Sequence, residues 1–220
     1  MHRRTTSQWM AAAFGVALAM VIVIRLAEGP GERVAMALRA TARWSFFLFW
    51  LASAGGALTT LFGSRFQALA KRSRDFGLAF ASAHLVHLGL VAWIYYSSAN
   101  PPKQPTLIFF GVAVFWTYLL AILSVKRLSA KLNPKVWRFV RTVGVEYIAF
   151  AFLVDFNKIS FQDGIASVMI YLSLLALAAA GPLLRIAAVV KRQSEARTLG
   201  TRCTCENVKQ KHVCDANDRQ

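Results

Sequence analysis

Two histidines, His84 and His87, stand three residues apart inside a long apolar stretch of the chain. Residues at this spacing share one face of a helix. A neutral imidazole can ligate a metal or a haem iron, and it can also give or take a proton near neutral pH. Ionisable groups at membrane depth are costly, so they favour a functional role. The competing interpretation is a buried histidine pair that neighbouring polar groups satisfy.

A second set of ionisable residues, Arg138, Arg141 and Glu146, lies in the apolar stretch 136–156. The arginines are near its start, where they can snorkel to phosphates or bind an anionic lipid or a haem propionate. Glu146 lies deeper, and a carboxylate there should be neutral or have a donor. At a rise of ~1.5 Å per residue, His84 and Glu146 are both about 13 Å deep. We therefore expect His84 to be its partner, with Arg141 as the second candidate.

The last polar segment carries ligand types for zinc. These residues are Cys203, Cys205, His212 and Cys214, with Cys-x-Cys and His-x-Cys spacing. The usual Cys-x-x-Cys spacing is missing, and reduced thiols without a metal are the competing interpretation. All three cysteines of the chain lie here, so the sequence predicts no disulfide framework for the rest of the protein.

The composition places these residues in an integral membrane protein. The chain has 220 residues, of which 56% are hydrophobic, and its mean hydropathy is +0.45. The apolar residues form long runs, as in membrane helices and unlike the core of a soluble domain. The formal net charge of +16 comes mostly from short basic segments beside those runs, which favours contact with anionic lipid over nucleic acid. We expect an all-α, polytopic membrane helical bundle.

Six apolar runs predict six transmembrane helices within a domain that covers residues 1–190. They lie at about 9–24, 44–62, 71–96, 106–125, 136–156 and 165–190. The first run resembles a signal peptide in layout, but its length and the absence of a small-x-small cleavage site favour a retained helix. Residues 28–43 predict a linker with a short helix in the membrane interface. Residues 191–220 predict a disordered tail.

Lysines and arginines predict the orientation of the bundle. They concentrate in the segments before the first run, between the second and third runs, between the fourth and fifth runs, and after the sixth. The basic residues in the loops after the third and fifth runs are only Lys103 and Lys158. Because basic loops stay in the cytoplasm, both termini are expected there. The basic loop after the first run, with Arg25 and Arg33, departs from this rule.

Two groups of motifs resemble a known membrane family. The first is the basic segment followed by Asp75-Phe76-Gly77-Leu78, with His87 ten residues past the glycine, and the second comprises Val136-Trp137-Arg138, Arg141-Thr142-Val143-Gly144 and Tyr147-Ile148. The region 44–156 thereby resembles the ferric reductase-like transmembrane family, which includes haem-binding membrane subunits of bacterial methionine sulfoxide reductase systems. Where that family pattern has a partner histidine, this chain has Arg141. Arginine stays protonated and cannot ligate iron.

The resemblance implies a membrane subunit of an oxidoreductase in the bacterial inner membrane. It implies haem b with His87 as ligand to the iron, His84 beside it, and Arg138 and Arg141 near the cofactor. Electrons would come from a separate redox partner, because no flavin or nicotinamide motif occurs in the sequence. The alternative is a haem-free bundle with a partner-binding or structural role. A transporter ranks third, since the two halves show no paired broken helices.

Overall fold

The computed structural model describes residues 5–27, 33–97, 103–124, 133–157 and 164–217, and in the last range it describes side chains for 168–197. Its elements are α1 (Thr6–Ala27), α2 (Arg33–Phe62), η1 (Gly63–Phe66), α3 (Gln67–Ser97), α4 (Gln104–Leu123), α6 (Pro134–Phe156) and α7 (Gly164–Asn217). The described chain is therefore all-helical, as predicted. Five of the six predicted apolar runs lie within a helix, and the fourth, predicted for 106–125, matches α4, which ends at Leu123.

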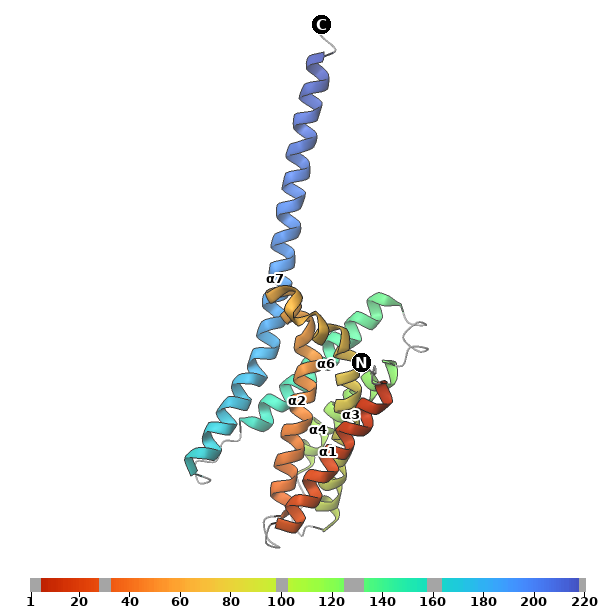
Figure 1. The fold of residues 1–220 in the computed structure, drawn as a ribbon, viewed down its shortest axis with the longest axis vertical. Helices are drawn as coiled ribbons and strands as arrows, with labels where there is room; N and C mark the ends of the chain where they lie inside the picture. Colours follow the sequence, from red (N-terminus) through yellow and green to blue (C-terminus); the bar gives the residue numbers. More distant parts are fainter. Residues whose placement is uncertain (1–4, 28–32, 98–102, 125–132, 158–163, 218–220) are drawn as a thin grey trace.

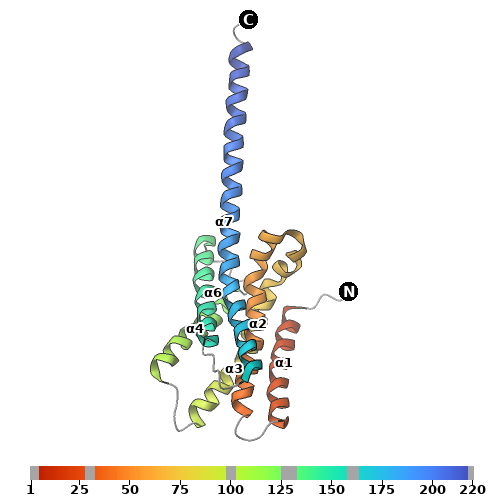
Figure 2. The same cartoon turned by 90° about the vertical axis from the view of Figure 1, so that its left-hand side faces the viewer.

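The helices form a bundle from which one end of α7 projects (Figure 1). Helices α1, α2 and α3 run side by side, and α3 turns back along α2 after the short helix η1 (Figures 1 and 2). Gly63 makes the reversal possible because its φ of 80° lies in the left-handed region, which a residue with a Cβ rarely adopts. Helix α4 packs on α6, and α6 on α7, which in turn contacts α2.

An aromatic cluster joins the two sides of this bundle. Phe46 of α2 is 1% exposed, and its ring centroid lies 5.2 Å from that of Phe152 and 4.9 Å from that of Phe156, both on α6. Phe49 of α2 and Phe80 of α3 continue the cluster, with centroids 5.4 Å apart. Edge-on and tilted contacts of this kind add to the stabilisation from buried area. The cluster fixes α2, α3 and α6 around one core.

The predicted interface helix in residues 28–43 is wrong for its described part. Residues from Arg33 onward form the first three turns of α2 and continue without a break into the predicted second span. The reason is a stripe of small residues at four-residue spacing: Ala37, Thr41 and Ser45 are each at most 1% exposed. This stripe packs inside the bundle, so the segment cannot lie flat in the interface.

Small residues also allow close helix contacts, as predicted for the run 52–57. A Cβ added at Gly55 of α2 would lie 3.2 Å from the backbone of Leu69 on α3, whereas one at Gly56 would meet nothing within 4 Å. Gly144 of α6 is tighter still, because an added Cβ would lie 2.8 Å from the Trp116 ring of α4. Glycine therefore sets the distance between helices at two crossings.

Four helical stretches of the described chain are long and apolar enough to cross a membrane by length and composition. They are Thr6–Ala27, Arg33–Ser97, Gln104–Leu123 and Val168–Arg197. The second stretch contains both α2 and α3. Helix α6 is not among them, because Arg141, Glu146 and Asp155 interrupt its apolar sequence. Long apolar helices are thus present, and the count of six spans stays a prediction.

Helix α7 differs from the prediction for the C-terminal segment. Its backbone continues as a helix to Asn217, although the sequence predicted a disordered tail from residue 191. This part of α7 projects away from the other helices (Figures 1 and 2). It contains no proline, so no residue in it must break the helix that begins in the apolar part of α7.

Candidate functional site

His87 is held by a hydrogen bond between α3 and α2. Its Nδ1 lies 3.1 Å from the hydroxyl of Thr41, and that hydroxyl lies 2.8 Å from the carbonyl oxygen of Ala37. A hydroxyl has one proton, and the shorter contact to Ala37 takes it. The Thr41 oxygen therefore accepts from Nδ1–H of His87. In a neutral ring this places the free lone pair on Nε2, which is then the nitrogen that a ligand could use.

His84 lies beside His87 and has a different environment. The two rings stack with centroids 5.2 Å apart and planes 21° from parallel. On the other side, the ring of Phe80 lies 5.4 Å from that of His84. Nδ1 of His84 is buried and has no hydrogen-bond partner within the part of the chain that the structure describes. The predicted histidine pair thus exists, but its two members are not equivalent.

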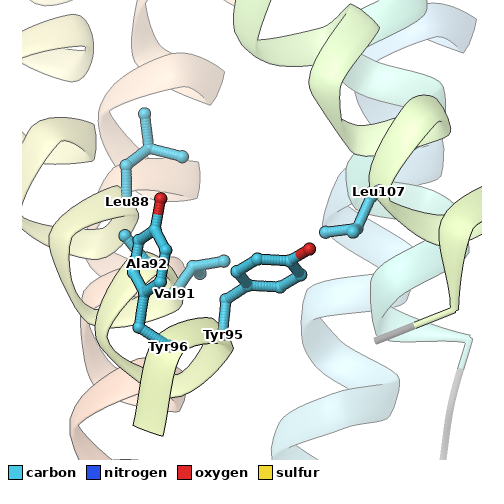
Figure 3. A pocket seen from close by; sticks show the side chains of 6 residues that line it. All are labelled: Leu88, Val91, Ala92, Tyr95, Tyr96 and Leu107. Carbon is cyan, nitrogen blue, oxygen red and sulfur yellow. The ribbon is translucent and has the colours of Figure 1, made fainter. Parts of the chain in front are cut away.

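An apolar hollow lies further along α3, toward its C-terminal end. It has a volume of about 330 Å³ and is lined by Leu88, Val91, Ala92, Tyr95 and Tyr96 of α3 and by Leu107 of α4. Figure 3 shows the Tyr95 ring reaching across the gap toward Leu107. Neither histidine lines this hollow, although Leu88 follows His87 directly in the sequence.

Glu146 does not pair with His84, and this prediction is wrong. Its carboxylate contacts Arg185 of α7: Nη2 of Arg185 donates to Oε2 at 3.1 Å, and Nε lies 3.1 Å from Oε1. The side chain of Arg185 is 19% exposed and that of Glu146 is 44% exposed. The equal-depth argument failed because depth along two helices does not say which faces meet. Here the Glu146 carboxylate is turned to the α6–α7 contact.

The second predicted partner, Arg141, contributes to the same region in another way. It lies close enough to Arg185 for their like charges to repel, and it is exposed on α6. Arg138 is also exposed, one turn nearer to the start of α6. Arg138 and Arg141 thus lie on α6, with Arg141 nearer to the ion pair, whereas His87 contacts α2. The structure therefore separates the predicted site residues into two places.

The proposed metal ligands of the C-terminal segment fall outside the described side chains. The backbone of Cys203, Cys205, His212 and Cys214 belongs to α7, and the zinc site stays a prediction. Elsewhere in the described chain, no three His, Cys, Asp or Glu residues gather to hold a metal ion.

Sequence reasoning missed two residues of these sites. Thr41 was placed in an interface helix, and nothing in its local sequence signals the contact with His87. Arg185 had a usable signal, because it is a single cation in an otherwise apolar run and Glu146 is a single deep carboxylate. Intramembrane charges of opposite sign tend to pair, which would have suggested this partner.

Comparisons of the chain with protein-family models, with curated proteins and with solved structures found no match. The resemblance to the ferric reductase-like family therefore rests on the two groups of motifs alone.

Proposed function

We propose that this protein is a polytopic membrane protein that binds a b-type haem through His87 and serves as a haem-carrying electron-transfer subunit. The observation that supports this most is the hydrogen bond from His87 Nδ1 to Thr41. Ligating histidines commonly donate their second ring nitrogen to an acceptor that fixes the tautomer and the ring orientation. Thr41, which is 0% exposed, provides such an acceptor here.

The donor set would hold a haem through one histidine of the described chain, His87. His84 is stacked on the same side as His87, so the two rings cannot bind opposite faces of one macrocycle. Arg141 does not stand in for a facing histidine, because arginine stays protonated and does not ligate iron. Two-histidine ligation, as in the family pattern, does not fit the described residues. A bound haem would supply one-electron chemistry at a single histidine.

The surroundings of the pair suit an apolar cofactor. Phe80 covers one side of His84, and Phe49 and Phe152 pack around Phe80. Apolar aromatic surroundings of this kind suit the flat apolar face of a haem, and iron ligation requires a neutral imidazole. Electrons would be delivered by a separate partner protein, as the resemblance implies. The residues of this chain would hold and orient the cofactor.

We further propose six spans with both termini in the cytoplasm. Two contacts support a location of the basic segments at the same end of the bundle. Thr6 at the start of α1 donates to Asp75 near the basic start of α3 at 2.8 Å, and Lys191 of α7 donates to the Thr60 carbonyl near the end of α2 at 3.0 Å. Reporter fusions after residues 100 and 200 test this. A periplasmic signal at 100 and a cytoplasmic signal at 200 are expected, and a periplasmic signal from the second fusion would overturn it.

The haem assignment is tested by absorbance of protein purified from haem-replete cells. We expect a b-type spectrum that His87→Ala abolishes and His84→Ala largely keeps. Thr41→Val removes only the acceptor for Nδ1, so it should shift the spectrum or weaken haem retention without abolishing it. Loss of the spectrum in the His84 variant with retention in the His87 variant would reverse the assignment.

A haem-free bundle with a partner-binding or structural role is the second candidate. The observation that favours it is that His87 already has a partner in Thr41, and that no histidine faces it from another helix among the described residues. In that case the pair would serve packing between α2 and α3. A colourless wild-type protein from haem-replete cells would decide for this second function.

A further inference from the structure

The hydroxyl of Ser45 differs from the other side-chain hydroxyls of α2. Each of those others donates to a carbonyl oxygen of its own helix, and they belong to Thr41, Ser53, Thr59 and Thr60. Ser45 is 0% exposed, and its Oγ has no hydrogen-bond partner in the described part of the chain. A serine inside a helix commonly bonds back to its own backbone. Because Ser45 does not, its hydroxyl is available to a group outside α2.

His84 has a matching deficit on α3. Its Nδ1 is buried and also lacks a hydrogen-bond partner among the described residues. The His84 ring lies between those of Phe80 and His87, with centroid distances of 5.4 and 5.2 Å. Buried polar atoms without a partner are rare and destabilising. Two such atoms on neighbouring helices therefore suggest one group that satisfies both.

The register of the two helices places Ser45 opposite His84. Ser45 lies four residues from Thr41 and four from Phe49, and both of these residues contact α3. The residues that they contact lie on either side of His84 along α3, three residues after it and four before it. Helix α3 runs back along α2, so the middle of one segment faces the middle of the other (Figures 1 and 2). Ser45 and His84 are thus at the same level of the bundle.

The rotation of the two helices brings these side chains to the same side of the contact. At about 100° per residue, Ser45 is rotated about 40° from Thr41, and His84 about 60° from His87. Thr41 and His87 contact each other directly at 3.1 Å and so mark the line between the helices. In two antiparallel right-handed helices, both rotations lead to the same side of that line. The two unpaired atoms therefore border one region between α2 and α3.

We propose that one water molecule lies in this region and bridges Oγ of Ser45 and Nδ1 of His84. The two atoms make no direct hydrogen bond. A water molecule can donate to one and accept from the other, whichever tautomer the histidine has, and two or more polar partners are what a buried water requires. Serine also leaves more room beside the ring than a threonine would. The water would hold His84 as Thr41 holds His87, and the proposal is independent of the haem because neither partner is the proposed ligand.

The test is brief X-ray irradiation of the full-length protein in detergent, followed by mass spectrometry. A bound water then releases hydroxyl radicals, which oxidise the side chains next to it even where bulk solvent does not reach. We expect oxidation of Phe80, whose ring lies beside His84 although the residue is only 4% exposed. Phe156 of α6 is the matched control, because it is 2% exposed and lies outside this region. Oxidation of Phe80 no stronger than that of Phe156 would overturn the proposal.

Variants on both helices connect the oxidation to the two partners. Ser45→Ala removes the hydroxyl and His84→Phe removes Nδ1 while keeping a ring, so each should lower Phe80 oxidation to the level of Phe156. Ser53→Ala is the control, since that hydroxyl donates to the Trp50 carbonyl at 3.2 Å, and it should leave the oxidation unchanged. If one variant fails to fold, the other still decides. Wild-type oxidation of Phe80 in a folded Ser45 or His84 variant, or an equal loss in the Ser53 variant, would show that no water bridges these residues.

Discussion

The two polar sites of the bundle reduce the free-energy cost of burying polar side chains in different ways. The α2–α3 site uses neutral groups, a histidine and a threonine hydroxyl whose proton goes to the backbone. The α6–α7 site uses full charges, a carboxylate and a guanidinium in contact. The hydroxyl-bearing residue of the neutral site, Thr41, is 0% exposed, whereas the carboxylate-bearing side chain of Glu146 is 44% exposed. The carboxylate of this bundle therefore lies where solvent or lipid headgroups and a guanidinium can stabilise its charge.

The helices of the two sites also differ in how many of their side chains are buried. Helices α2 and α3 supply most of the fully buried residues, while α7 exposes many large apolar side chains. Lys191 nevertheless ties α7 to α2 by donating to the carbonyls of Thr60 and Leu61, at 3.0 and 3.4 Å. A cation at the C-terminal end of a helix satisfies orphan carbonyls and complements the helix dipole. The two sides of the bundle are therefore joined at a few specific contacts.

The largest effect on stability is expected at Phe46, whose ring joins α2 to α6. Phe46→Ala should lower the free energy of unfolding by about 3 kcal/mol or more, because it leaves a cavity between α2 and α6. Phe47→Ala is the matched control, since Phe47 is 45% exposed and should change stability little. Thermal or denaturant unfolding in detergent measures both. Equal losses would show that the aromatic cluster does not join the two sides.

The charged site is tested by Glu146→Leu against Glu146→Gln. The leucine variant leaves Arg185 without its carboxylate and should cost about 1–3 kcal/mol. The partial exposure of Glu146 places the cost toward the lower end. The glutamine variant keeps a hydrogen-bond acceptor and should cost less. If thermal unfolding gives the same stability for both variants, the ion pair with Arg185 contributes nothing to the fold.

The charged site also predicts a rescue. Replacing both members by Glu146→Leu with Arg185→Leu should recover most of the stability lost in the single variant, because no lone charge remains. The coupling energy from the four proteins of this cycle measures the pair itself. A double variant less stable than the single one would mean that Arg185 has another essential partner in the bundle.

The neutral site should respond more weakly. Thr41→Val has nearly the shape of threonine but cannot accept from His87, so we expect a cost of about 1 kcal/mol from the unpaired Nδ1–H. Thr41→Ser keeps the hydroxyl and should retain more of the stability. The same unfolding measurement decides. A valine variant as stable as the wild type would show that the histidine finds another acceptor.

The smallest expected effect concerns the spacing of α2 and α3. Gly56→Ala should stabilise by up to about 1 kcal/mol, because alanine is the better helix former and meets nothing there. Gly55→Ala should gain less or lose, since its Cβ would lie 3.2 Å from Leu69. Unfolding of the two variants side by side gives the difference. An equal gain at both positions would mean that the helices can move apart freely.

Much of the helical structure could be predicted from the sequence. The third, fourth and fifth predicted runs match α3, α4 and α6 within a few residues, because apolar runs bounded by Pro, Asn and basic residues signal helices clearly. The start of α2 was predicted poorly. Its arginines suggested a helix in the membrane interface. Ala37, Thr41 and Ser45 form a buried stripe, and such a stripe can be recognised only when the helix that faces it is known.

Composition and residue spacing alone predicted that the described chain is all-helical with long apolar helices, and that His84 and His87 share a helix face. These features depend on composition and on spacing along one helix, which are local properties. The partners of the polar residues became known only from contacts between helices. Thr41 is the partner of His87, and Arg185 is the partner of Glu146. Arg141 lies apart from the histidines. These pairings depend on how helices rotate and which faces meet, and packing between distant segments sets that rotation.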